Sequence, residues 1–240
     1  MDKNLGCKYN PQSAITWFFE NEEKGIILED DCLPSLSFFR YCQELLNRYE
    51  NDLRVWGISG TNLQPNIQVP YSYYFSNYFM TWGWATWRNR WQQHLKELPN
   101  LNLYFNDPVM QNKLPSKIAN QRLLNYVKNS FEDKLDAWDY LWIFSCMANN
   151  GLLATPSKNM IQNIGFGEDA THTFGNSRNQ VTEVEIDFPL EHPLVISTNN
   201  TIDQSFYKNV FRWKTVLEKI KDPNHIKAFI HARLRPIFNR

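Results

Sequence analysis

Cysteine is scarce in this 240-residue chain, which contains no C-x-x-C pair. The cysteines are Cys7, Cys32, Cys42 and Cys146. Their scattered positions predict neither a zinc cage nor a ladder of disulfides. Thiols placed in this way are typical of the reducing cytosol, so we expect a cytoplasmic protein.

A long hydrophobic run is also lacking. The longest apolar stretch, Leu141–Ala148, is far shorter than the roughly 20 residues that cross a bilayer. The sequence therefore predicts a protein that is soluble or, at most, peripheral at the inner face of the plasma membrane.

Neither sign of charge dominates the composition, because Lys and Arg number 25 and Asp and Glu number 25. This balance excludes a uniformly basic nucleic-acid-binding protein, and we expect no nucleic acid as a partner. The charges are nevertheless divided unevenly along the chain. Residues 205–240 carry nine Lys and Arg against two Asp and Glu, which gives them +7 and leaves −7 on residues 1–204.

Hydrophobic residues make up 42% of the chain and aromatic residues 15%, which is enough for a sizeable core. The length suits one large α/β domain or two small ones. The spacing of apolar residues predicts helices over 14–20, 36–49, 85–98, 117–129 and 138–144, and strands over 26–28, 54–59 and 152–155. The order of the first two strands and the helix between them predicts a βαβ unit with parallel strands, a right-handed crossover and an open α/β sheet.

Three carboxylates, Glu29, Asp30 and Asp31, follow the first predicted strand directly. Ligands bind in open α/β sheets at the carboxyl ends of the strands, and carboxylates gathered there repel one another unless a cation is present. Mg²⁺ or Mn²⁺ would neutralise them and bridge the phosphates of a nucleotide-sugar. A solvated acidic turn before the next helix is an equally good interpretation of the position alone, because acids near a helix start are favourable.

Aromatic residues crowd the segment from Tyr71 to Trp91. We expect most of them to pack in the core, because large aromatic side chains are usually buried. Aromatic rings beside polar groups also bind sugar rings, so some of them are candidates for carbohydrate contact.

Short motifs follow one another along the chain, namely Ile27–Asp31, Phe38-Phe39, Val55–Gly60 with Asn62, Met80–Trp87, Trp138-Asp139 and Pro156–His172. In this order they resemble the nucleotide-diphospho-sugar transferases of the GT-A fold, in particular the N-acetylglucosaminyltransferase I type. Asn4–Cys7 and Asn163–Asp169 resemble more closely a set of bacterial proteins labelled hemolytic protein or nucleotide-diphospho-sugar transferase. The similarity covers about residues 2–173.

The resemblance implies a GT-A fold, which is an open mixed sheet flanked by helices. It places a glycosyltransferase domain at residues 1–200 and a basic helical tail at residues 201–240. In that family the motif at Asn4 follows the first strands of the sheet, so the resemblance implies that the strands carrying much of the nucleotide-base pocket are missing here.

The same resemblance implies an inverting, metal-dependent transferase of bacterial polysaccharide or glycoconjugate synthesis, with a UDP- or GDP-sugar donor and a glycan acceptor. Mn²⁺ or Mg²⁺ would bind Asp31, and His172 would complete the metal shell. The residues implied in donor binding are Glu29, Asp30, Asn62, Trp82, Glu168 and Asp169. The general base would be Asp139 or Asp136, which lie one turn apart. An ordinary acid at a helix start remains the alternative for Asp139, and a surface residue the alternative for His172.

Two further interpretations remain open at this point. A truncated, catalytically defective homologue would act as a sugar-binding or assembly module, and a membrane-active protein is a weaker third alternative that the hemolytic label suggests. The basic tail is either an amphipathic segment on an anionic membrane or a helical hairpin packed on the domain.

Overall fold

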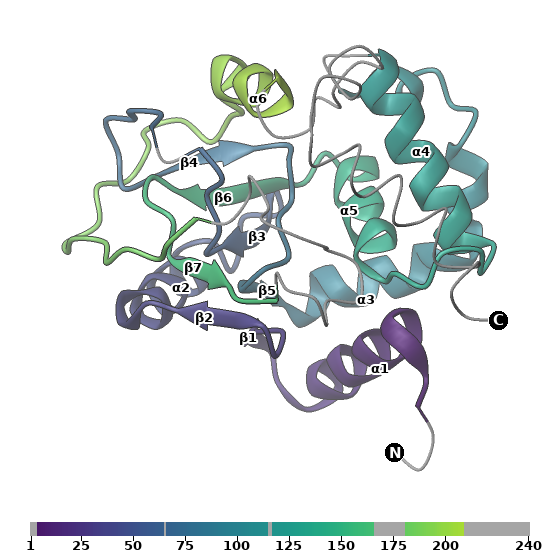
Figure 1. Ribbon diagram of the computed structural model, residues 1–240, viewed down its shortest axis with the longest axis horizontal. Helices are drawn as coiled ribbons and strands as arrows, with labels where there is room; N and C mark the ends of the chain where they lie inside the picture. The colour runs from purple at the N-terminus through teal and green to yellow at the C-terminus, as the bar shows by residue number, and fades with distance from the viewer. Residues whose placement is uncertain (1–3, 65, 115–116, 166–180, 209–240) are drawn as a thin grey trace, which may run out of the picture. The chain divides into compact units, whose positions relative to one another are not determined.

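The computed structural model describes residues 4–64, 66–114, 117–165 and 181–208. These residues form both helices and strands (Figure 1). In chain order the elements are α1 (Gly6–Asn21), β1 (Lys24–Ile27), β2 (Cys32–Pro34), α2 (Leu36–Arg48), β3 (Val55–Ser59), β4 (Tyr73–Ser76), β5 (Trp84–Trp87), α3 (Arg88–Glu97), the 3-10 helices η1 (Leu98–Tyr104) and η2 (Met110–Asn112), α4 (Lys117–Phe131), α5 (Asp139–Ala148), β6 (Leu152–Pro156), β7 (Ile161–Asn163) and α6 (Asn200–Phe206).

A mixed sheet of five strands lies at the centre, in the order β1-β5-β3-β6-β4 (Figure 1). Strand β5 is antiparallel to both β1 and β3, whereas β3 and β6 are parallel. β1 and β3 therefore run in the same direction, as predicted, but β5 lies between them. β2 and β7 form a separate two-stranded antiparallel sheet.

Helices cover both faces of the sheet. On one face, Val55 and Ile58 of β3 pack with Phe38 of α2 in a buried cluster. On the other face, Trp56 packs with Trp142 of α5, in a second cluster to which α1 and α3 also contribute. Side chains of β3 thus enter both cores, and this explains why the strand is buried throughout.

The predicted helix over 85–98 is wrong in its first turn. The chain forms strand β5 there, and helix α3 begins only at Arg88. Trp84 and Ala85 point into opposite cores, and β5 pairs with a neighbour on each side. These contacts outweigh the local helix propensity that suggested a longer helix. β4 and the short strands β2 and β7 were not predicted.

The start of α1 also differs from the prediction, because the helix begins at Gly6 instead of near Ser13. The carboxylate of Asp136 accepts hydrogen bonds from the backbone N–H groups of Cys7 (2.9 Å) and Lys8 (2.7 Å). The free N–H groups of a helix start are therefore satisfied from a distant part of the chain, which local sequence does not reveal. The other predicted helices, α2, α4 and α5, are confirmed within a few residues.

Helix α6 begins at the predicted boundary between domain and tail. The carboxylate of Asp203 accepts hydrogen bonds from the hydroxyl of Ser76 (2.6 Å) and the side-chain amide of Asn77 (3.1 Å). These bonds join α6 to the end of β4, so the first residues of the predicted tail belong to the folded unit. The rest of the tail, residues 209–240, lies outside the described residues.

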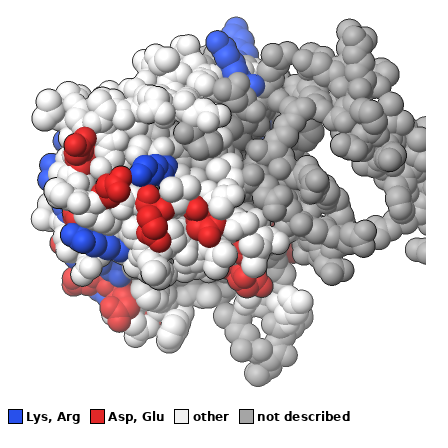
Figure 2. Space-filling view, turned by 60° about the vertical axis from the view of Figure 1, so that its left-hand side comes forward, with Lys and Arg blue, Asp and Glu red and all other residues white. Residues whose placement is uncertain are grey.

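Charges of both signs lie interspersed on the face that Figure 2 shows. Several of the exposed charges are paired, such as Lys158 with Asp187 at 2.9 Å. Among the residues that the structure describes, no helix combines the length and the apolar character that a bilayer span requires.

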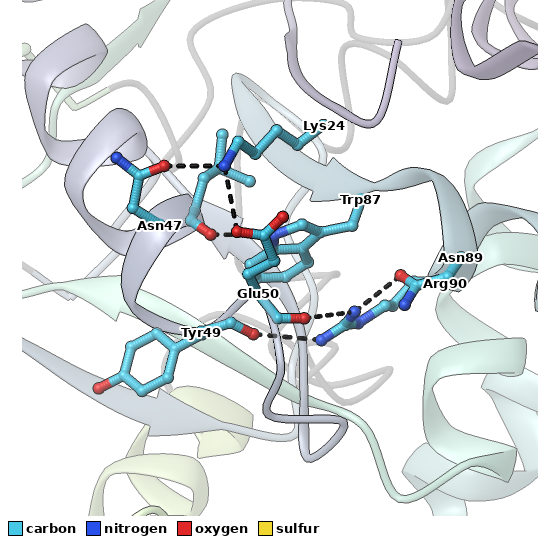
Figure 3. Close-up of polar contacts among 8 residues, drawn as sticks. Lys24, Asn47, Tyr49, Glu50, Trp87, Asn89 and Arg90 are labelled. Carbon is cyan, nitrogen blue, oxygen red and sulfur yellow. Dashed lines mark hydrogen bonds and ion pairs between the residues drawn. The ribbon is translucent and has the colours of Figure 1, made fainter.

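The buried guanidinium of Arg90 holds the end of α2 against α3 (Figure 3). It donates hydrogen bonds to the backbone carbonyls of Glu50 (2.9 Å), Tyr49 (3.2 Å) and Asp52 (3.1 Å). It also donates to the side-chain oxygen of Asn89 at 2.7 Å. The carbonyls at a helix end lack partners within the helix and carry partial negative charge, so a buried cation stabilises them.

We expect Arg90→Met to lower the free energy of unfolding by about 3 kcal/mol or more, because it removes a buried donor and with it the hydrogen bonds to three backbone carbonyls. Arg54→Met is the matched control, because Arg54 is exposed and, among the described residues, forms its ion pair with Asp52, so its loss should have a much smaller effect. Urea unfolding of both variants measures the difference. Equal destabilisation would show that Arg90 does not hold the helix end.

His94 is a buried histidine between α3 and α5. Its Nδ1 lies 2.8 Å from the hydroxyl oxygen of Ser145, and Trp91 and Trp142 pack against its ring. Burial lowers the pKa of His94 to about 3 from an ordinary value of 6.5. The imidazole therefore stays neutral in the folded protein at pH values where the unfolded chain binds a proton.

Because the unfolded state binds the extra proton, His94 should make the protein less stable as the pH falls from 6.5 toward 3, by about 1.4 kcal/mol per pH unit. His94→Asn, which keeps a polar atom near the position of Nδ1, should remove this contribution to the change of stability with pH. Thermal unfolding of both proteins at several pH values between 4 and 8 tests it. Parallel curves for the two proteins would contradict the assignment.

Candidate functional site

The carboxylates of the acidic motif lie in the turn between β1 and β2, which we call the acidic turn (Glu29–Cys32). The backbone N–H of Cys32 closes it by donating to the carbonyl of Glu29 at 3.1 Å. Ligand atoms of Glu29, Asp31 and Cys32 lie within 4.8 Å of one another, and these side chains are half-buried. Asp30 is exposed and is not part of this group. The turn therefore gathers two of the three predicted carboxylates.

The charge of this cluster changes the ionisation of Glu29. Burial, together with the neighbouring negative charge of Asp31, raises the pKa of Glu29 to about 7. The charges of Asp139 and Asp30 act in the same direction with smaller effects. Glu29 and Asp31 thus repel each other when both are ionised, and a bound cation would relieve that repulsion.

Trp138 connects the acidic turn to helix α5. Its indole N–H donates a hydrogen bond to the carboxylate of Glu29 at 3.4 Å, and its ring stacks on Trp84 with centroids 5.8 Å apart. Trp138 directly precedes Asp139, the first residue of α5. The buried indole therefore places Asp139 where its charge acts on Glu29, so two motifs that are 109 residues apart meet at one site.

The other side of the acidic turn is formed by β7 and the residues after it. The side-chain amide of Asn163 donates to the carboxylate of Asp31 at 3.3 Å, and the backbone N–H of Ile164 donates to the Asp31 carbonyl at 2.8 Å. A Cβ on Gly165 would lie 2.2 Å from the Asp31 carboxylate, so this close approach requires glycine. Sequence reasoning did not single out the contribution of Asn163. Glu168, Asp169 and His172 lie outside the described residues.

The two candidates for the general base lie in different surroundings. Asp139 lies at the N-terminus of α5, and its charge contributes to the raised pKa of Glu29. Asp136 accepts the hydrogen bonds that begin α1, which is a structural role. The geometry therefore favours Asp139 over Asp136 as the residue of the site.

The prediction that Asn62 contacts the sugar is not supported. Asn62 is buried, and its side-chain N–H groups donate to the carbonyls of Pro156 (2.9 Å) and Ser157 (3.0 Å). Its side-chain oxygen accepts from the backbone N–H of Gln64 at 2.8 Å, so the amide holds two loops together. Trp82 is half-buried and packs against the core on the α2 face.

The donor atoms of the acidic turn fit a hard divalent cation. Mg²⁺ and Mn²⁺ are commonly held by one or two carboxylates, with waters and substrate phosphates completing the shell. Glu29 and Asp31 supply such a pair. Cys32, which sequence reasoning missed, lies beside them, but burial and the charge of Asp31 raise the pKa of its thiol to about 12. The oxygen atoms, and not the protonated sulfur, therefore define the site at neutral pH.

Comparison of the chain with known protein families and with curated proteins finds no match. The functional interpretation therefore depends on the motifs and on the geometry of the acidic turn with Trp138 and Asp139.

We expect Asp31→Asn to lower the pKa of Glu29 from about 7, because it removes the charge that acts on Glu29 most strongly. Asp30→Asn is the matched control and should lower that pKa less, because Asp30 contributes the smaller effect. Carboxyl ¹³C NMR titration of Glu29 in the three proteins measures the shift. A larger shift in Asp30→Asn would show that the turn is arranged differently.

Proposed function

We propose that this protein is a metal-dependent glycosyltransferase of GT-A type, which moves a sugar from a nucleoside-diphosphate sugar to an acceptor hydroxyl with inversion. The observation that carries the proposal is the contact of Trp138 with Glu29, because it joins a carboxylate pair suited to a cation with a further carboxylate on α5. A transferase of this type needs both groups: the carboxylate pair, with its cation, for the diphosphate, and the further carboxylate for the proton of the acceptor hydroxyl.

The fold is compatible with this proposal. The acidic turn follows the carboxyl end of β1, which runs parallel to β3 and β6. In α/β sheets, ligands bind beside the carboxyl ends of the parallel strands. A donor diphosphate at the acidic turn would thus occupy the usual position for a nucleotide in this class of fold.

In the proposed mechanism, Glu29 and Asp31 would hold a divalent ion, which would supply positive charge for the departing diphosphate. Asp139 accepts the proton of the acceptor hydroxyl while that oxygen forms its bond to the anomeric carbon. The bond between the anomeric carbon and the diphosphate oxygen breaks at the same time. Because the acceptor attacks from the side opposite the leaving group, the anomeric configuration inverts. The acceptor would be a glycan of bacterial polysaccharide or glycoconjugate synthesis.

If Asp139 is the base, Asp139→Asn should lower kcat by about 10²–10⁴-fold and leave the affinity for the donor nearly unchanged. Asp136→Asn is the control on the same segment: it should lower the melting temperature through the loss of the α1 cap, yet keep most of the turnover well below that temperature. Turnover is measured with a panel of UDP- and GDP-sugars, Mn²⁺ and mixed glycan acceptors.

The donor titration separates the transferase from its alternative, a sugar-binding module. Mn²⁺-dependent binding of a UDP- or GDP-sugar that Asp31→Asn abolishes supports the transferase. Glycan binding that survives Asp31→Asn, together with no affinity for any donor in the panel, would contradict the transferase and leave the binding module.

A further inference from the structure

An open surface cavity lies between α4 and the segment formed by η1 and η2, and no residue of the acidic turn lines it. Its volume is about 560 Å³, within the usual range for small-molecule sites. Residues Gln121, Asn125 and Lys128 form one wall. They are spaced four and three residues apart, so they lie on one face of α4.

Side-chain amides dominate the lining. Asn102 and Asn106 face Gln121 and Asn125 from the opposite wall. The side chains of Asn106, Gln121 and Asn125 are exposed, so their amides are accessible to a ligand from solvent. Each amide offers both a donor and an acceptor, which is what paired hydroxyl groups of a sugar require. Phe105 adds an apolar surface for the C–H face of a sugar ring.

The cavity is also positively charged. Arg122 and Lys128 line it, and no carboxylate does among the described residues. The Nζ of Lys128 is 3.9 Å from the carboxylate of Glu132. The Nζ of Lys134 is closer to the same carboxylate, at 2.5 Å. The charge of Lys128 is therefore available to an anion, because Glu132 has a closer cation. Residues 98–131 carry four Lys and Arg against one Asp, so the surrounding segment is basic as well.

We propose that this cavity binds a saccharide that carries an acid group, such as a uronic acid, separately from the glycosyl-transfer site. The amides hold the hydroxyl groups, and Lys128 binds the carboxylate. A nucleic acid fits the lining less well, because its affinity depends on many phosphate contacts and two cations line the cavity. A free inorganic anion would leave the amides without a role.

The test is isothermal titration at low ionic strength with EDTA present, so that its result does not depend on a metal or on a sugar donor. The probes are a disaccharide of glucuronic acid and glucose, the neutral disaccharide cellobiose, inorganic phosphate and a ten-residue oligothymidine. We expect the acidic disaccharide to bind about tenfold more tightly than cellobiose, and the difference to shrink in 0.5 M NaCl.

Substitutions test whether the disaccharides bind in this cavity. Lys128→Gln should weaken binding of the acidic disaccharide about fivefold and leave cellobiose unaffected. Lys117→Gln, the same change at an exposed position of α4 that does not line the cavity, is the control and should change neither. Asn125→Leu should weaken both disaccharides, because it removes an amide without breaking the helix. Melting temperatures confirm that each variant is folded.

Several results would overturn the proposal. Equal affinity for the acidic and neutral disaccharides would remove the role of charge, and phosphate binding as tight as that of the acidic disaccharide would remove the role of the sugar. Tighter binding of the oligothymidine would indicate a nucleic-acid site. An equal loss in Lys117→Gln and Lys128→Gln would place the binding elsewhere on the helix. A failure here leaves the proposed transferase intact, because no residue of its site is involved.

Discussion

The candidate site depends on two contacts of the Trp138 side chain, one with Trp84 and one with Glu29. Its ring stacks on Trp84 in the core between the sheet and α5, while its N–H reaches the carboxylate of Glu29. The core thereby determines the position of α5 relative to the acidic turn, and Asp139 follows because it is the next residue. A buried aromatic pair is well suited to this role, since close packing leaves the rings few alternative positions.

The acidic turn shows why such support matters. Glu29 and Asp31 repel each other, and a half-buried pair of like charges tends to separate or to bind protons. Hydrogen bonds from Trp138 to Glu29 and from Asn163 to Asp31 oppose this tendency from two sides. Gly165 permits the second contact, because any side chain there would meet Asp31. Under the proposed function, the cation site would thus be prepared by groups that do not themselves bind the cation.

Sequence reasoning predicted what local patterns encode. The apolar stripe of α2 was recognisable from its regular period and β3 from its short, largely apolar run, and the acidic motif was recognisable from its place after a strand. Sequence reasoning failed where contacts between residues far apart in the sequence determine the local structure. The start of α1 depends on Asp136, strand β5 depends on neighbours that precede it by many residues, and Asn62 is occupied by carbonyls of Pro156 and Ser157. The contact between Trp138 and Glu29 is of the same kind.

The strand order has a consequence for synthesis on the ribosome. β3 is the middle strand, yet its partners β5 and β6 lie after it in the chain, and β6 begins at Leu152. For much of translation, therefore, the central strand of the sheet has an unpaired edge that invites association with other chains. The pairing is also long-range in sequence, which slows folding. Release of α5 and β6 from the exit tunnel would then be the moment at which the nascent chain ceases to be a client for chaperones.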